Sequence, residues 1–400
     1  MPPSGLLAWL ARGMAWMAGV GLLVLLLASG VLQRMDTALY DLNQRYWHYA
    51  PDDDIVIVAI DPKTLSSLGR WPLPRALHAQ LIDRLEAYGV RGIGMDVTMS
   101  AADIDHPEND AALAQAMDRN GKVIMPMFAE APELGGPLEE TLPLPALALN
   151  AAGIGHVDVA RDADGMVRGA YLDAGLGRPY WPALALALYR MEHSLPTGQL
   201  PGLRAPHTDD ASPYLWMRDH YVLLRYADPV GGFGRVSYAD VIAGTVPAPL
   251  LKGRWVLVGA TAEGMGDIIQ TPGARIPGVE YQANLFESLR RGWLVTPVGL
   301  PGQLALGSAA WLLPLLLYGL PGFRRAWRAA LFSAALLIAS SLYLLRVHYL
   351  WWPPTAGLLI LAAGFAAWSL FAWRHHAEPV LRQDGQHRPA GPLHETDSLG

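Results

Sequence analysis

Four long stretches of apolar residues constrain this chain more than any other feature of its sequence. They cover residues 14–32, 300–320, 329–345 and 353–373. A helix that crosses a hydrocarbon core about 30 Å thick needs about 20 apolar residues, and these stretches are near that length. The sequence therefore predicts four transmembrane helices, one before and three after a long polar segment.

The first stretch has a second interpretation. Ala28, Ser29 and Gly30 are small residues of the kind found at signal-peptide cleavage sites. The apolar run is long for a signal peptide, so we favour an uncleaved anchor. Both interpretations export the segment that follows, residues 33–298.

Arginine positions predict the orientation in the membrane. Arg324, Arg325 and Arg328 lie between the second and third stretches, and Arg374 follows the last one. Basic residues accumulate on the cytoplasmic side, which places residues 1–13 and 374–400 inside the cell. We expect a multi-pass inner-membrane protein with its large domain periplasmic, and a disordered cytoplasmic tail over residues 374–400. The outward loop 346–352 contains Tyr and Trp, the residues that are enriched at membrane–water interfaces, so we expect it to lie at the outer interface.

Composition agrees with residence in the lipid bilayer and excludes several classes of site. The chain is 52% hydrophobic and 16% charged, whereas soluble domains are about 25% charged.

A net charge of −6 gives no basic surface for nucleic acid. The chain has no cysteine and no histidine pair at helical i, i+4 spacing, so we expect no metal and no cofactor. The apolar stretches lack Asp, Glu and Lys, which favours an anchor or signal conduit over a transporter.

Residues 33–298 alternate between patterns typical of strands and of helices. Continuous apolar runs predict buried strands, and amphipathic spacing predicts helices between them. The expected strands are 55–60, 92–97, 122–127, 166–172 and 255–259, and the expected helices are 75–89, 111–117, 181–191 and 279–289. Residues 132–145 and 195–213 are rich in Pro and Gly and predict loops. This order predicts a mixed α/β domain with a largely parallel sheet.

The order of short motifs resembles the CHASE type 2 sensor domain, an extracytoplasmic module of bacterial receptors, over residues 36–295. The matching pieces are Tyr40-Asp41, the strand ending in Asp61, residues 71–75, 94–96, 164–168 and 258–261 with Asp267, then 271–272 and 277–280. The arrangement of three membrane helices after the domain also resembles this family. The resemblance implies a dimeric sensor that regulates a cytoplasmic output domain, such as an adenylate or guanylate cyclase or a kinase.

Residues 374–400 are too few for a catalytic domain. We therefore expect no enzymatic activity in this chain, and expect the output activity in a cyclase or kinase partner or in a missing continuation.

Polar residues at strand ends predict a ligand site. Asp61 and Asp96 end two strands, and Arg75 begins the helix between them. Open α/β sheets bind ligands at the carboxyl edge of their strands, so this group could hold a polar or cationic small molecule. The alternatives are a buried Asp–Arg ion pair that closes the sheet edge, and core packing for Trp71. The candidate ligand-binding residues are Asp61, Trp71, Arg75, Asp96, Thr261 and Asp267.

Three other motifs are interpreted as structural. Residues 162–165 have the spacing of a calcium loop, but Asp173 stands where a bidentate Glu is required. We expect a hairpin turn there, with Arg168 pairing a turn carboxylate. Residues 259–264 have Walker-like spacing without the lysine, and 231–234 is expected to be a loop.

The sequence therefore favours a signal-sensing receptor subunit that detects an extracytoplasmic stimulus, either a small molecule or an envelope ligand. Two alternatives stay open. The chain could be the sensor part of a cyclase or kinase whose catalytic domain lies outside it, or an envelope protein-binding or assembly module.

Overall fold

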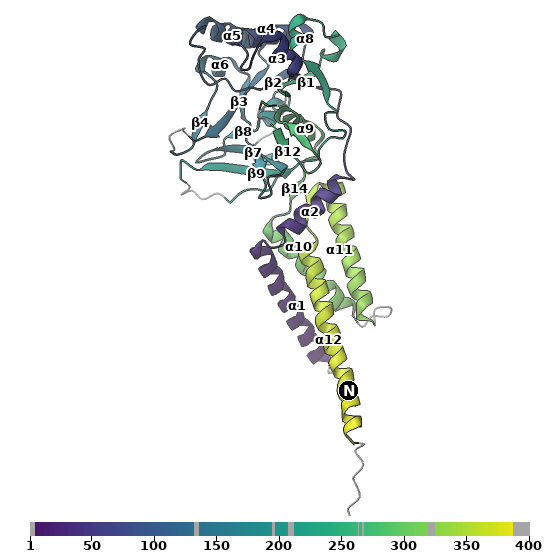
Figure 1. The fold of residues 1–400 in the computed structure, drawn as a ribbon. Helices are drawn as coiled ribbons and strands as arrows, with labels where there is room; N and C mark the ends of the chain where they lie inside the picture. The colour runs from purple at the N-terminus through teal and green to yellow at the C-terminus, as the bar shows by residue number, and fades with distance from the viewer. Residues whose placement is uncertain are drawn as a thin grey trace, which may run out of the picture. The chain divides into compact units, whose positions relative to one another are not determined.

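The computed structural model describes residues 5–131, 136–193, 197–206, 212–262, 264–265, 268–318 and 325–386 (Figure 1). The chain divides into two compact units. The globular unit comprises Thr37–Gly299 and Leu344–Trp352, and the helical unit comprises Met1–Asp36, Leu300–Tyr343 and Pro353–Gly400. The α-helices are α1 (Gly5–Ser29), α2 (Gln33–Gln44), α3 (Pro62–Leu68), α4 (Arg75–Tyr88), α5 (Pro107–Asn120), α6 (Pro145–Asn150), α7 (Leu184–Tyr189), α8 (Tyr238–Ala243), α9 (Gly278–Arg291), α10 (Leu300–Leu317), α11 (Ala326–His348) and α12 (Thr355–Gln386).

All strands of the described residues belong to the globular unit. They are β1 (Ile55–Ile60), β2 (Gly92–Asp96), β3 (Val123–Glu130), β4 (Glu139–Thr141), β5 (Gly153–His156), β6 (Ala160–Arg161), β7 (Val167–Leu176), β8 (Trp181–Pro182), β9 (Trp216–Leu223), β10 (Gly234–Ser237), β11 (Trp255–Ala260), β12 (Ile268–Gln270), β13 (Arg275–Pro277), β14 (Thr296–Pro297) and β15 (Leu350–Trp351).

The main sheet of the globular unit has the order β10-β1-β11-β2-β3-β4, and β5 pairs with β3. Its pairs are parallel except for the antiparallel pair β3–β4. The strands β1 and β11 are in register from Ile55 opposite Trp255 to Ile60 opposite Ala260. The prediction of a mixed α/β fold with a largely parallel sheet is confirmed.

Both faces of this sheet are covered, which explains its continuous apolar strands. Successive side chains of a strand point to opposite faces. Val56 and Val58 pack in the core that includes α4 and α5, whereas Ile55 and Ile57 pack in the core that includes α7 and α9. Helix α4 ends where the sequence predicts, since Gly89 adopts a left-handed conformation with φ of 71° and donates its N–H to Glu86.

A second sheet has the order β6-β7-β8, with β9 paired to β7. Its strands are antiparallel, and its buried side chains join the core formed with α7 and α9. Here the predicted boundaries shift. Residues 181–182 form β8 against β7, so the helix predicted from 181 begins at Leu184. The predicted loop 132–145 contains β4, and the predicted loop 231–234 ends where β10 begins.

The helical unit contains the predicted membrane helices. Among the described residues, three helices are long and apolar enough to cross a membrane: Trp9–Ser29, Leu300–Leu317 and Ala326–His348. The fourth predicted helix corresponds to α12, whose apolar part Thr355–Leu370 is shorter, so a fourth crossing stays a prediction. The backbone of α12 is helical through Gln386, beyond the end predicted at residue 373. The remaining residues of the predicted tail lie outside the described ones.

The loop between α11 and α12 belongs to the globular unit. Its strand β15 pairs in parallel with β14, the segment that precedes α10. Thr296 donates its backbone N–H to Tyr349 O at 2.8 Å, and Val298 donates to Trp351 O at 2.9 Å. Trp351 is only 6% exposed and packs edge-on against Tyr40, so it contributes to protein packing rather than to an exposed belt.

Candidate functional site

A cavity of about 300 Å³ lies at the carboxyl ends of β2 and β11, the edge where open α/β sheets place their ligands. Its lining combines apolar side chains with the polar side chains of Asp96, Thr98, Tyr281 and Gln282, and small-molecule sites combine the two kinds of group in this way. The lining residues are Trp71, Asp96, Val97, Thr98, Val157, Val159, Ala260, Met265, Ile269, Gly278, Tyr281 and Gln282.

Gln282 supplies an unusual polar group to this cavity. The residue lies on α9 and is only 3% exposed, yet its side-chain oxygen Oε1 has no hydrogen-bond partner. An unsatisfied buried acceptor costs about 1–3 kcal/mol. Folded proteins pair nearly all such groups, so this oxygen is available to accept a hydrogen bond from a ligand or from water.

The close approach of α9 to the sheet forms one wall of the cavity. Helix α9 begins at Gly278, directly after β13. A side chain at Gly259 on β11 would place its Cβ only 2.6 Å from Cβ of Val279. Glycine at this position therefore lets the helix end pack against the strand end beside the cavity.

The structure brings two of the candidate ligand-binding residues together. Trp71 and Asp96 both line the cavity, and Trp71 is 39% exposed. Thr261 is not among the lining residues, and its backbone N–H donates to Ile60 O at 3.1 Å. Asp267 lies outside the described residues.

The other two candidates have structural contacts elsewhere. Asp61 caps α3, accepting hydrogen bonds from the backbone N–H of Thr64 at 2.8 Å and from the hydroxyl of Ser237 at 3.0 Å. Arg75 pairs with Asp110 at 3.3 Å and donates to Ala101 O at 2.9 Å. The alternative interpretation expected an ion pair of Arg75 with a strand-end carboxylate, and Arg75 pairs instead with Asp110 on α5.

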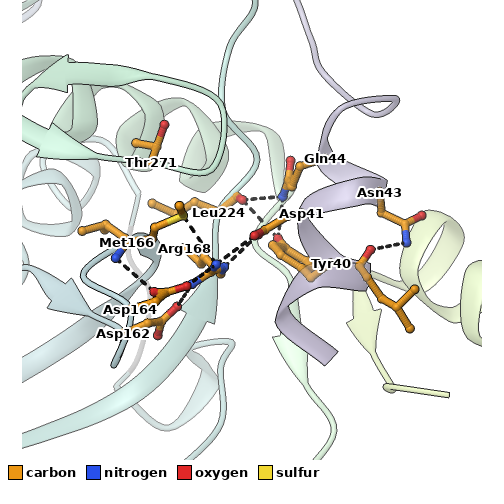
Figure 2. A network of polar contacts seen from close by, with 12 residues as sticks. Tyr40, Asp41, Asn43, Gln44, Asp162, Asp164, Met166, Arg168, Leu224 and Thr271 are labelled. Atoms are coloured by element: carbon orange, nitrogen blue, oxygen red, sulfur yellow. Dashed lines mark hydrogen bonds and ion pairs between the residues drawn. The ribbon is translucent and has the colours of Figure 1, made fainter. Parts of the chain in front are cut away.

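A second feature is the polar network around Arg168 on β7, shown in Figure 2. The side chain of Arg168 is 3% exposed, and its guanidinium contacts three carboxylates. Nε and Nη2 lie 2.7 and 2.8 Å from the two oxygens of Asp41, and further bonds reach Asp162 at 2.7 Å and Asp164 at 2.8 Å. The predicted pairing of Arg168 with a turn carboxylate is confirmed. Asp41 is the partner that sequence reasoning missed, although it belongs to the Tyr40-Asp41 motif of the resemblance.

The charges of this network stabilise one another. Hydrogen bonds to Asp41 hold the pKa of Arg168 above its usual range, and the guanidinium lowers the pKa of the Asp164 carboxyl. Since Asp41 lies on α2, the network fixes this helix to the second sheet.

Two more side chains of α2 bind the same part of the domain (Figure 2). The hydroxyl of Tyr40 donates to Leu224 O at 3.1 Å, and Gln44 Nε2 donates to the same oxygen at 2.6 Å. Helix α2 follows α1 along the chain after a three-residue turn, Gly30–Leu32. The chain emerging from the first apolar helix is thus held by an ion pair and by hydrogen bonds.

Next to Leu224, Arg225 forms an aromatic clamp. Its guanidinium carbon lies 4.4 Å from the ring centroid of Trp47, 4.8 Å from that of Trp293 and 5.5 Å from that of Tyr49. Its Nε donates to Trp47 O at 3.1 Å. Burial lowers the pKa of Arg225. The ring of Trp47 also stacks on that of Tyr349, with centroids 5.8 Å apart.

These features define a class of protein: a mixed α/β domain with a cavity at its sheet edge, joined to apolar membrane helices. The model of the CHASE2 domain family matches residues 18–320, and the chain therefore belongs to the CHASE2 family. This is a family of sensor domains, so the resemblance in the sequence is confirmed. A comparison with curated proteins finds no match, and neither does a comparison with solved structures.

Proposed function

We propose that this membrane-anchored sensor binds an extracytoplasmic ligand in the cavity at the sheet edge and passes the signal through its helices to a cytoplasmic output partner. The observation that carries the proposal is the ion pair between Arg168 and Asp41, because it ties the ligand-bearing domain to the helix that follows α1. A cyclase or kinase partner, a homodimeric state and a periplasmic position of the domain at the inner membrane belong to the same proposal.

A short chain of contacts leads from the cavity to α2. Tyr281 lines the cavity, and its hydroxyl donates to Gly169 O at 3.2 Å. Gly169 follows Arg168 on β7, and Arg168 binds Asp41. A ligand that moves α9 therefore displaces the strand that carries the guanidinium, and the ion pair transmits this displacement to α2.

The other end of α9 leads to the aromatic clamp. Trp293 follows the helix after one residue and contacts the guanidinium of Arg225, which also contacts Trp47. In the same unit, β14 and β15 join the segments next to α10, α11 and α12. The strand pair thus joins the segment before α10 to the segment between α11 and α12, and Trp47, three residues after α2, belongs to the clamp.

The ligand acts by shifting a conformational equilibrium. It favours the conformation that it binds more tightly, and the shift cannot exceed the difference between its two affinities. The catalytic output then belongs to a partner or to a further part of a longer chain.

The relay can be tested with spin labels, since the natural sequence has no cysteine. Labels at Gly13→Cys on α1 and Leu316→Cys on α10 report the distance distribution within the helical unit. Asp41→Asn weakens the ion pair and should change this distribution, whereas Asp83→Asn, which breaks an exposed ion pair with Arg119, should not. Identical distributions for Asp41→Asn and the unmodified protein would refute the relay.

The orientation needs a separate test. Reporter fusions after residue 120 should behave as exported, and fusions after residue 380 as cytoplasmic. Alkaline phosphatase activity at the second position and none at the first would contradict the proposed topology.

A further inference from the structure

The lining of the cavity at the sheet edge indicates which class of ligand it binds, provided that the cavity has the proposed ligand-binding role. Three properties of its lining define the chemistry of an occupant: an unpaired acceptor, the sign of its charge and an aromatic wall. From them we infer that the cavity selects a small organic ammonium ion with at least one N–H donor, held by Gln282, Asp96 and Trp71.

The unpaired acceptor requires a donor. Gln282 Oε1 is buried in a lining residue and has no partner among the described residues. The neighbouring hydroxyl of Tyr281 does not serve it, because that hydroxyl donates to Gly169 O. A ligand N–H or O–H would complete this hydrogen bond, whereas a ligand with acceptors alone would leave two lone pairs facing each other.

The charge of the lining favours a cation. Asp96 is an acidic lining residue, and the lining within the described part of the chain includes no Lys, Arg or His. Burial raises the pKa of Tyr281, so its phenol stays neutral. The start of α9 at Gly278 opposes this field, but a helix end is equivalent to about half a positive charge, less than one carboxylate. The carboxylate of Asp96 therefore favours a cation over an anion among the described lining residues.

The apolar part of the lining indicates the chemistry of the rest of the ligand. Trp71 forms an exposed aromatic wall, and an indole face attracts an ammonium group. Val97, Val157 and Ile269 supply aliphatic surface. A cavity of about 300 Å³ accommodates an apolar body of one ring or a few carbons in addition to the charged group.

A matched series of four probes on the full chain in detergent tests the class by calorimetry. The probes are phenethylammonium, its N,N,N-trimethyl analogue, 2-phenylethanol and phenylacetate. We expect phenethylammonium to bind at least tenfold more tightly than the trimethyl analogue, which lacks a donor, and than phenylacetate, which has the wrong charge. The alcohol should fall between them. Preferential binding of phenylacetate, or no binding of any probe at 10 mM, would overturn the inference.

The variant Gln282→Met separates recognition from folding. It removes the buried oxygen at nearly constant shape, so we expect an unchanged or higher melting temperature together with at least tenfold weaker binding of phenethylammonium. The control Gln270→Met makes the same change outside the cavity lining and should bind like the unmodified protein. Unaltered binding by Gln282→Met would contradict the assigned acceptor.

The two proposals fail separately. The probe series uses the unmodified chain and does not depend on the folding of any variant. A distance change on Asp41→Asn without amine binding would retain the relay and discard this ligand class.

Discussion

Arg168 and Asp41 form a two-point ion pair although 127 residues separate them in the chain. Nε lies 2.7 Å from Oδ1 and Nη2 lies 2.8 Å from Oδ2, so the planar guanidinium and the carboxylate meet edge to edge. Bidentate pairs of this kind are stronger and more directional than single contacts. Arg168 therefore attaches α2 to the second sheet through a directional contact.

Replacing Arg168 should destabilise the globular unit strongly. Arg168→Met leaves Asp41, Asp162 and Asp164 clustered without a counter-charge. Because breaking a buried pair costs about 3–5 kcal/mol and these carboxylates are partly exposed, we expect a loss of about 3 kcal/mol. Denaturant unfolding in detergent measures it. Arg168→Lys keeps the charge and should lose less, and equal losses for both variants would show that charge is not the main contribution.

The stability of the globular unit should decrease as the pH falls below about 6.5. Burial lowers the pKa of His78 and of His156 from 6.5 to about 4. The neighbouring Arg75 lowers the pKa of His78 further, whereas for His156 the nearby Asp158 acts in the opposite direction. Both imidazoles are neutral in the folded state, so the unfolded chain takes up protons first. Their contribution is present above pH 6.5 and is lost between pH 6.5 and 4.

The expected slope is about 1.4 kcal/mol per pH unit for each histidine. His156→Gln should remove one histidine's share of the slope between pH 6.5 and 5 while leaving the dependence above pH 7 unchanged. Unfolding midpoints at constant ionic strength test this. A slope that His156→Gln does not alter would exclude His156 as a source of the pH dependence.

The clamp predicts that arginine is required at position 225. Arg225 is 6% exposed, and its guanidinium lies over the rings of Trp47 and Trp293. Lysine keeps the charge but loses the planar stacking and the hydrogen bond to Trp47 O, so we expect Arg225→Lys to cost about 2 kcal/mol. Tryptophan fluorescence during urea unfolding reports the change. Arg119→Lys, at an exposed ion pair, should stay within about 0.5 kcal/mol of the unmodified protein.

A methyl group at residue 259 should disturb the cavity wall. The Cβ of Gly259→Ala would lie 2.6 Å from Cβ of Val279, which forces α9 away from β11. Overpacking of this kind costs about 1–3 kcal/mol. A comparison of melting temperatures with Gly273→Ala, where nothing lies within 4 Å of the added atom, isolates the effect. Equal melting temperatures for the two variants would show that α9 moves away from β11 without loss of stability.

The central strands could be predicted because both faces of the main sheet are buried. Strands such as β1 and β11 are continuous apolar runs in the sequence, and their burial leaves few alternatives. Strand β9 was missed because Arg218, Asp219 and His220 interrupt its pattern. Asp219 is buried and pairs with Arg204, and His220 has a φ of 54°. Local hydrophobicity cannot show a strand whose polar side chains are paired by tertiary contacts.

The candidate site was predictable only in its position. Open α/β sheets bind ligands at the carboxyl ends of their strands, and this tendency led to Trp71 and Asp96, which line a cavity. The same tendency also led to Asp61, whose carboxylate caps α3, a short helix that the sequence did not indicate. Gln282 gave no signal, since a glutamine in an amphipathic helix is ordinarily exposed. Contacts such as Arg168 with Asp41 depend on segments far apart in the chain, and no local pattern encodes them.

The strand pair β14–β15 has a practical consequence for isolating the sensor domain. The two strands are parallel, and a tight turn can join only antiparallel strands, so a long return path must connect them. In this chain, α10 and α11 supply that path. Truncation after Gly299 would remove Tyr349 and Trp351, expose Tyr40 and Trp47 and leave one edge unpaired. A secreted version therefore needs residues 344–352 rejoined through an extended artificial linker, or added as a separate peptide.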